Sequence, residues 1–284
     1  MSVINTNVKS LIAQNAMSVN NRTMSKAMEQ LSTGSRINSA ADDAAGLAIS
    51  NKMTAQIRGL NQAVRNANDG ISMIQTAEGA TKEITNMLQR MRELAVQAGN
   101  DTYTDDDRLS MENEFIELYE EIDRVSENTQ WNGMNLLDGT VGSSGAVTFQ
   151  VGANDGTDFT IEVTFEDMSA TTGLSITAST ATTTPDLFAD NTSSQAVIDE
   201  LDDAIADVDE FRSDLGAKIN RLTYAADNLT NISQNTTASR SRIQDTDFAS
   251  ATTELARTQI ISQAATAMLA QANQQPQMVL KLLG

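Results

Sequence analysis

Apolar residues recur at helical spacing along one long stretch of the chain, from Ser39 to Gly99. The steps between them alternate between four and three residues, which is the heptad pattern of a helix with one buried stripe. No proline interrupts the stretch, and Ser39 with Asp42 has the spacing of a capping box. The pattern predicts one helix of about sixty residues that needs partners for its stripe. The stripe comprises Met53, Ile57, Leu60, Val64, Ala67, Ile71 and Ile74, then, after a short step at Ala77, Thr81, Ile84, Leu88, Met91, Ala95 and Ala98.

Two further helices are predicted to pack against this stripe. Thr104 followed by acidic residues 105–107 has the composition of an N-cap and first turn, so a helix is expected to run on through Val125, antiparallel to the first. The heptad pattern returns between Ser194 and Ile232. We expect this second heptad helix to be the main partner of the first.

Both ends of the chain have the pattern of weaker amphipathic helices. Residues 1–35 carry sparse apolar positions among Asn, Ser, Gln and Thr, and a segment of this kind orders only when it packs on something else. Residues 34–39 are expected to form a joint before the long helix. At the other end, a polar stretch over 235–246 is expected to lead into a final helix that contains Leu255 to Leu269.

The hydrophobic period changes from helical to two between these helices. Val147, Phe149 and Val151 alternate with small or polar residues, a turn signal follows at 154–156, and alternation resumes from Phe159 to Phe165. This pattern predicts a β-hairpin. Residues 170–184 are rich in Thr and Ser with few apolar positions, so an exposed loop or a weak strand is expected there.

Composition excludes most enzyme chemistry. The chain of 284 residues has no Cys and no His, which removes disulfides, thiol nucleophiles, imidazole acid–base catalysis and zinc sites built on those ligands. The carboxylates at 105–107 and 199–203 lack the ligand spacing and glycine of an EF-hand, and a solvated face is the better interpretation. We therefore predict no catalytic site, no cofactor and no metal.

The charge distribution separates the middle of the chain from its ends. The net charge is -19, which argues against binding to nucleic acid or anionic lipid. Residues 101–214 contain 27 acidic residues and three arginines, a balance of -24, whereas the two ends are nearly neutral. This distribution predicts a middle that faces water and ends suited to close packing. No segment has the pattern of a signal peptide or a membrane span, so the protein is expected to be cytosolic or to leave by a route that reads no such signal.

Several ordered motifs at both ends resemble those of bacterial flagellin, the filament subunit of the flagellum. The resemblance covers roughly residues 1–165 and 195–284. The motifs are LSTGSRINSA at 31–40, DDAAGLAI at 42–49, QTAEGA at 75–80, QRMRELAVQ at 89–97, NGMNLLDG at 132–139, IQDTDFA at 243–249 and AMLAQAN at 267–273.

The resemblance implies a mainly α fold: a long antiparallel helical bundle or coiled coil with paired N- and C-terminal helices and a small β-hairpin insertion. Its domains would be an inner terminal coiled coil (1–38 and 246–284), a helical rod (39–140 and 193–245) and a rudimentary variable segment (141–192). It further implies a secreted subunit, exported unfolded by a type III route, that polymerises head to tail into the motility filament. No nucleic-acid or membrane-inserted partner is expected.

The resemblance also assigns candidate contact residues and partners. Some flagellins activate Toll-like receptor 5, and five residues here match their receptor contact: Gln89, Arg90, Leu94, Gln97 and Glu114. We expect these residues on outward faces, where they could equally contact neighbouring subunits. Val279, Leu280, Leu282 and Leu283 are expected to pack in the filament core or to bind the flagellin export chaperone. Filament cap and hook–filament junction proteins are further implied partners.

Two other structural functions compete with this interpretation. A hook–filament junction protein has terminal helices of the same kind, but is expected to match the motif at 89–97 less well. A non-polymerising coiled-coil scaffold would not need paired apolar ends.

The threonines of the variable segment are candidates for O-linked sugars, although Thr-rich loops are more often bare.

Overall fold

The computed structural model describes residues 7–176, 188 and 191–283, with side chains described as far as residue 274 at the C-terminal end. The chain divides into two compact units, one made of Met1–Ile57 and Gln234–Gly284 and the other of Arg58–Ser233. We call them the terminal unit and the central unit. Two long helices run through the boundary between them, because α2 spans Ala44–Ala98 and α4 spans Asn191–Gln244. The fold is mainly α, as predicted, while the division at residues 38 and 246 stays a prediction.

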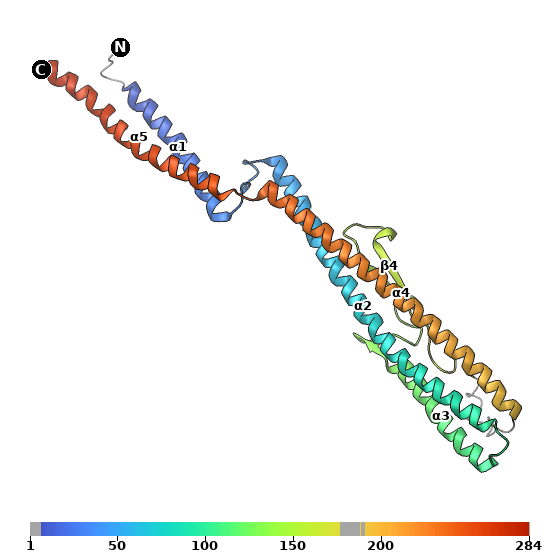
Figure 1. Ribbon diagram of the computed structural model, residues 1–284. Helices are drawn as coiled ribbons and strands as arrows, with labels where there is room; N and C mark the ends of the chain where they lie inside the picture. The colour runs from blue at the N-terminus through green and yellow to red at the C-terminus, as the bar shows by residue number, and fades with distance from the viewer. Residues whose placement is uncertain (1–6, 177–187, 189–190, 284) are drawn as a thin grey trace. The chain divides into compact units, whose positions relative to one another are not determined.

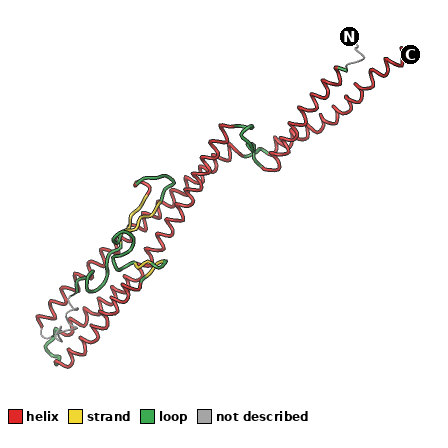
Figure 2. The backbone as a smooth tube through the Cα atoms, turned by 180° about the vertical axis from the view of Figure 1, so that it is seen from behind, coloured by secondary structure: helices red, strands yellow, loops and turns green. Residues whose placement is uncertain are grey.

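In the terminal unit, the first and last helices lie side by side (Figures 1 and 2). Helix α1 spans Val8–Thr33 and α5 spans Phe248–Leu283. The amide Nδ2 of Asn7 donates to the carbonyl oxygen of Ala272, and that of Asn20 donates to the carbonyl oxygen of Thr258, each at 2.9 Å. Since the partner number falls as the α1 number rises, the two helices are antiparallel. The predicted pairing of the terminal helices is confirmed.

In the central unit, α2 and α4 form the core together with α3, which spans Asp105–Asn128 (Figure 1). Every residue of the predicted α2 stripe is buried or half-buried, including those on both sides of the short step at Ala77. The stripe therefore does face partners within the subunit. Helix α3 begins as expected, since Thr104 and Asp107 form a reciprocal capping box and the first turn carries three aspartates.

The start of α2 differs from the prediction. The capping-box partners Ser39 and Asp42 do interact, since the Ser39 amide donates to the Asp42 carboxylate at 3.0 Å. The helix nevertheless begins at Ala44, and its cap is Asp43, whose Oδ1 accepts from the Gly46 amide at 2.9 Å. Ser39 and Asp42 thus close a turn before the helix, because two acidic residues in succession offer two possible caps.

Helix α4 is longer than its apolar stripe. The sequence predicts an end near Ile232 and a polar stretch over 235–246, but the helix continues to Gln244. No glycine or proline interrupts this part, and polar pairs with α2 replace apolar packing. Ser233 Oγ donates to Asn61 Oδ1 at 2.8 Å, and Ser50 Oγ donates to Gln244 Oε1 at 2.7 Å.

The predicted β-hairpin is present and packs on α2. Strand β3 spans Ala146–Gln150 and pairs antiparallel with β4, Thr160–Thr164, in a register that places Phe149 opposite Ile161. A Cβ added at Gly70 would lie 3.0 Å from the Phe149 ring, so the absent side chain lets the hairpin approach the helix. Phe159, expected to begin the second strand, instead lies in the 3₁₀ turn Thr157–Phe159.

The segment between this hairpin and α4 differs in part from the expected exposed loop, because its described apolar residues are buried while Thr171, Thr172 and Ser175 are exposed. Ala170, Leu174 and Ile176 are at most 5% exposed and belong to the central core. Phe188 joins them, with its ring edge-on to that of Phe115 at 5.6 Å. Widely spaced apolar residues give no period, but each still fills a gap in the core. Thr180 and Thr182–Thr184 lie outside the described residues. A second, shorter hairpin pairs β1 (Gln130–Trp131) with β2 (Met134–Asn135).

Candidate functional site

The paired terminal helices bury small and polar residues and expose large apolar ones. Up to residue 274, where the description of side chains ends, the buried residues of α1 and α5 are Ser10, Asn20, Ala27, Ala251 and Thr258. The exposed large apolar residues are Val8, Leu11, Ile12, Val19 and Met28 on α1, and Phe248, Ile260, Ile261 and Met268 on α5. Many large apolar residues exposed on one pair of helices favour a protein–protein contact there. We call these nine residues the terminal apolar surface.

The joint between α1 and α2 is held to the chain between α4 and α5 by short antiparallel pairing. Gly34 ends α1 in the left-handed conformation, with φ of 70°. Its carbonyl oxygen accepts from the Thr246 amide at 2.9 Å, and the Arg36 amide donates to the Gln244 carbonyl oxygen at 2.6 Å. The Arg36 side chain adds a bond from Nη2 to the Ile243 carbonyl oxygen at 2.6 Å. The predicted joint is therefore an ordered connection between the two ends of the chain.

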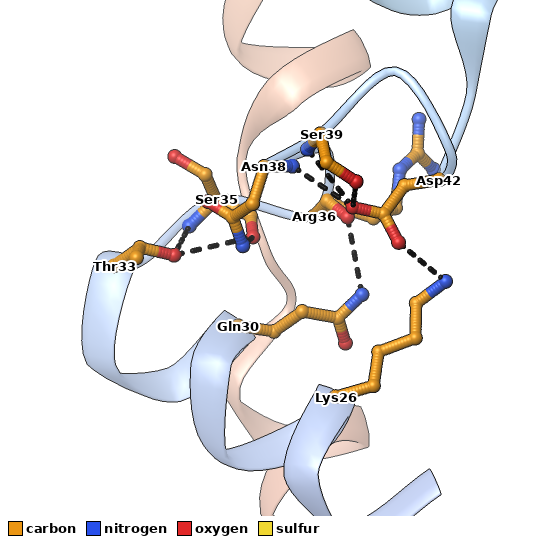
Figure 3. Close-up of polar contacts among 8 residues, drawn as sticks. All are labelled: Lys26, Gln30, Thr33, Ser35, Arg36, Asn38, Ser39 and Asp42. Atoms are coloured by element: carbon orange, nitrogen blue, oxygen red, sulfur yellow. Dashed lines mark hydrogen bonds and ion pairs between the residues drawn. The ribbon is translucent and has the colours of Figure 1, made fainter. Parts of the chain in front are cut away.

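The Asp42 carboxylate collects the polar contacts on the α2 side of this joint (Figure 3). Lys26 Nζ from α1 lies 2.8 Å from Oδ1, while the amides of Asn38 and Ser39 donate to Oδ2 at 3.3 and 3.0 Å. These donors, the Lys26 ammonium first among them, hold the pKa of Asp42 well below its usual range. Asp42 thereby connects α1 to the turn that precedes α2.

Two of the predicted receptor-contact residues are brought together on the surface of the central unit. Arg90 Nε donates to Glu114 Oε1 at 2.9 Å, and its Nη1 donates to Glu93 Oε2 at 3.0 Å. The guanidinium's hydrogen bond to Glu93, the larger effect, and its hydrogen bond to Glu114 both raise the pKa of Arg90. Gln97 is exposed and donates from Nε2 to the Tyr103 hydroxyl at 3.2 Å, and Gln89 is exposed as well.

Leu94 does not lie on an outward face, so that expectation is wrong. Its side chain is 2% exposed and belongs to the core that α2 forms with α3 and α4. The cause is the helical period: Leu94 lies three residues after Met91, next to the buried stripe. Val279, Leu280, Leu282 and Leu283 lie within the backbone of α5, but their side chains are outside the described part of the chain.

Sequence reasoning missed three polar contacts between distant segments. Arg92 binds Asp202 through two hydrogen bonds, from Nε at 2.5 Å and from Nη2 at 3.1 Å, and so links α2 to α4. Asp123 accepts from the Ala170 amide at 2.7 Å, and Lys26 reaches Asp42. Heptad positions bring Arg92 and Asp202 to one side of the helix pair, but the other two contacts leave no periodic signal.

The described residues contain neither a metal-binding group nor a membrane span. Over that part of the chain, no group of three acidic side chains is placed to hold a metal ion. None of the helices, within the same limits, is long and apolar enough to cross a bilayer.

Comparison with known proteins places the chain in one family along nearly its whole length. The family model for the bacterial flagellin N-terminal helical region matches residues 4–141, and that for the C-terminal helical region matches residues 198–283. Flagellin of Halalkalibacterium halodurans is 50% identical over 281 residues, and flagellin of Bacillus subtilis strain 168 is 47% identical over 304 residues. Each alignment covers 99% of both chains.

A flagellar hook-associated protein from Vibrio parahaemolyticus has a similar solved structure, with a TM-score of 0.59, 14% identity, and coverage of 72% of this chain and all of that one. That likeness concerns the fold alone, whereas the sequence agreement with filament proteins extends from end to end. The short acidic chain with paired terminal helices therefore belongs to the bacterial flagellins, the subunits of the flagellar filament.

Proposed function

We propose that copies of this flagellin join into the filament through the terminal apolar surface, with α1 and α5 of each copy packing against those of its neighbours. The observation that carries the proposal is the reversed burial of this helix pair, in which isoleucines are exposed and an asparagine is buried. Exposed apolar surface is unfavourable in water, and burial between copies removes that cost. Because each copy presents different faces to successive neighbours, the contact extends as a helix without closing.

Truncation tests this proposal directly. Removing residues 1–35, or residues 255–284, deletes one helix of the pair and leaves the central unit intact. We expect a folded, soluble monomer with the helical circular dichroism of the central unit and no filaments in negative-stain microscopy after seeding. Filaments formed by either truncated chain would refute the proposal.

We propose further that the subunit travels unfolded through a type III export channel and folds at the filament tip. The buried points of the α1–α5 pair are few and largely polar, so the isolated pair has little apolar burial to hold it together. The apolar residues Val279, Leu280, Leu282 and Leu283 offer an export chaperone a binding segment at the end of the chain. Serine at all four positions should abolish chaperone binding in a pull-down while leaving the thermal unfolding of the central unit unchanged.

Contacts with the filament cap and the hook–filament junction proteins follow the same reasoning. Both would meet a terminal copy whose apolar surface has no further subunit to cover it. Cross-linking from the terminal helices of end subunits, followed by mass spectrometry, would test these contacts.

Recognition by Toll-like receptor 5 is a second proposed function of the same subunit. The supporting observation is that Gln89, Arg90, Gln97 and Glu114 are exposed on the central unit, with Arg90 and Glu114 already oriented by their ion pair. Leu94 would support this surface from below, since it is buried. In a reporter-cell assay, Arg90→Ala should lower the potency of the monomer, with Arg124→Ala on α3 as the control. Full potency of Arg90→Ala would contradict this role.

A further inference from the structure

The first half of α4 carries a line of exposed carboxylates on one flank. Asp203, Asp207, Glu210 and Asp214 follow one another in steps of four, three and four residues, which places them along a single stripe of the helix. All four are exposed. Asp214 lies one turn before Lys218, whose Nζ donates to the Glu162 carbonyl oxygen of β4 at 3.0 Å. The stripe therefore runs on the flank of α4 that the hairpin adjoins. We call it the acidic stripe.

An exposed pair of arginines lies on α2 in the same unit. Arg58 and Arg65 on α2 each follow a residue of the buried stripe directly and stand two turns apart. Gly59 and Asn66 come one residue later, and the step of about 100° per residue brings these onto the other flank of α2. There Gly59 meets Ala153, and Asn66 donates to the Gln150 carbonyl oxygen at 3.1 Å. The hairpin thus contacts the face of α2 that carries Gly59 and Asn66, and the arginine pair lies about 100° away around the helix.

Within the described part of the subunit, neither surface forms an ion pair. Among the described residues, no Lys or Arg nitrogen lies within 4 Å of a carboxylate of the acidic stripe, although the neighbouring Asp202 and Asp209 bind Arg92 and Arg212. Over the same part of the chain, no carboxylate lies within 4 Å of the guanidinium of Arg58 or Arg65, and Arg65 donates only to Gln62. Carboxylates three and four residues apart on one helix repel each other, which is unfavourable in an isolated copy.

We propose that the acidic stripe of one copy binds the arginine pair of a neighbouring copy along the filament. The inference rests on polymerisation but not on the terminal apolar surface, because both groups lie in the central unit. A head-to-tail contact joins two different surfaces of the same chain, and these two surfaces lie on different helices and carry opposite charge. Charge complementarity of this kind selects register and partner and suppresses wrong pairings.

A second copy fits this pair of surfaces better than another partner does. The stripe cannot pack against the stripe of another copy, because like charges would meet. The remaining outcome is that both surfaces only face water and keep the monomer soluble. Paired charge reversals separate the two possibilities.

The test uses two double variants of the full chain. Arg58→Glu with Arg65→Glu makes both surfaces acidic, and Asp207→Lys with Glu210→Lys places two lysines at the centre of the stripe. Seeded polymerisation at low salt is followed by light scattering, which gives the critical concentration. We expect each double variant alone to raise it by about tenfold or more, since like charges then face each other. The matched control, Lys82→Glu with Arg124→Glu, has the same net charge as the first variant and should polymerise normally.

Mixing the two double variants supplies the deciding measurement. In alternating copies, the glutamates of the first variant meet the two central lysines of the second, and the arginines of the second meet the unchanged acidic stripe of the first. We expect an equimolar mixture to polymerise near the wild-type critical concentration. The difference in critical concentration between each variant alone and wild type should shrink as salt shortens the Debye length from about 10 Å at 0.1 M to about 3 Å at 1 M. The proposal is overturned if the first variant polymerises like its control, or if folded variants fail to copolymerise. Loss of filaments on truncation of α1 would not bear on this result.

Discussion

Two exposed isoleucines on the terminal helices allow a quantitative test of the assembly surface. Ile12 is 66% exposed and Ile260 is 67% exposed. The perturbation is Ile12→Ser with Ile260→Ser in the full chain. Serine has nearly the same helix propensity as isoleucine, so α1 and α5 are expected to keep their helical structure in the variant.

The magnitude follows from the area that remains to be buried. Full burial of an isoleucine side chain contributes about 1.5–3 kcal/mol. Two-thirds of each side chain is still in water in the subunit, so burial between copies would contribute about 1–2 kcal/mol for each isoleucine, and about 2–4 kcal/mol for the two together. At about 1.4 kcal/mol for each factor of ten, the critical concentration should rise by a factor between about 30 and several hundred.

The assay is seeded elongation measured by light scattering over a range of subunit concentrations, with filaments checked by negative-stain microscopy. The matched control is Gln14→Ser with Gln259→Ser, because these exposed polar residues lie on the same two helices and removing them deletes no large apolar group. We expect the control to polymerise at the wild-type critical concentration. A critical concentration for the isoleucine variant within about twofold of wild type would refute burial of these side chains between copies.

Three further predictions concern the folded subunit. Asp42→Asn removes a carboxylate whose lowered pKa stabilises the α1 joint at every pH above the usual aspartate pKa, so protease should cleave α1 faster in the variant at neutral pH. The difference in cleavage rate from wild type should vanish as the pH falls well below the usual aspartate pKa, and Glu29→Gln serves as the control. Gly70→Val should speed hydrogen exchange of the β3–β4 amides because a side chain there meets Phe149, whereas Gly79→Val, which meets nothing within 4 Å, should not. Leu88→Ala leaves a cavity at a fully buried site and should lower the free energy of unfolding by about 2–5 kcal/mol in chemical denaturation, while Leu109→Ala, at an exposed position, should cost far less.

Periodic burial is the part of this structure that the sequence predicts well. The stripe on α2 is buried along its whole length, and the cap and acidic first turn of α3 are where the sequence places them. Both rest on local rules: a residue's face follows from helical geometry, and a cap bonds within one turn. The hairpin is predicted for the same reason, since alternation determines which residues share a face.

The differences arise where a tertiary contact decides between local alternatives. Asp42 and Asp43 both have side chains suited to cap α2, and the donors gathered around Asp42 leave that role to Asp43. The polar end of α4 stays helical because side chains on α2 bond to it. Leu174 and Ile176 have no period, yet both are buried. Each outcome depends on a partner that is distant in sequence, so no local window contains it.

For the candidate contact residues too, the sequence identifies the residues, and the structure shows their contacts and burial. The family resemblance selects Arg90 and Glu114 as residues that match the receptor contact. The structure adds the ion pair between them, which no spacing rule predicts because they come from different helices. It also separates Leu94 from the exposed members of the set, since burial at 2% leaves it a supporting role. A motif identifies the residues of a surface together with the core residues that hold them in place.

The two units of this flagellin differ in which residues they bury and which they expose to water. This difference bears on how a subunit can be both soluble and able to polymerise. The central unit buries its apolar stripes and exposes charge, so it can fold without a neighbour. The terminal unit buries Asn20 and Thr258 and exposes isoleucines, so its packing is incomplete in a single copy. Neutral ends can come together in a filament without placing unpaired charge in its interior, whereas the acidic middle keeps free subunits apart. A contact between unlike charges in the central unit would then set the register in which the apolar ends meet, and this separation of roles is what the mixing experiment and the isoleucine variant measure independently.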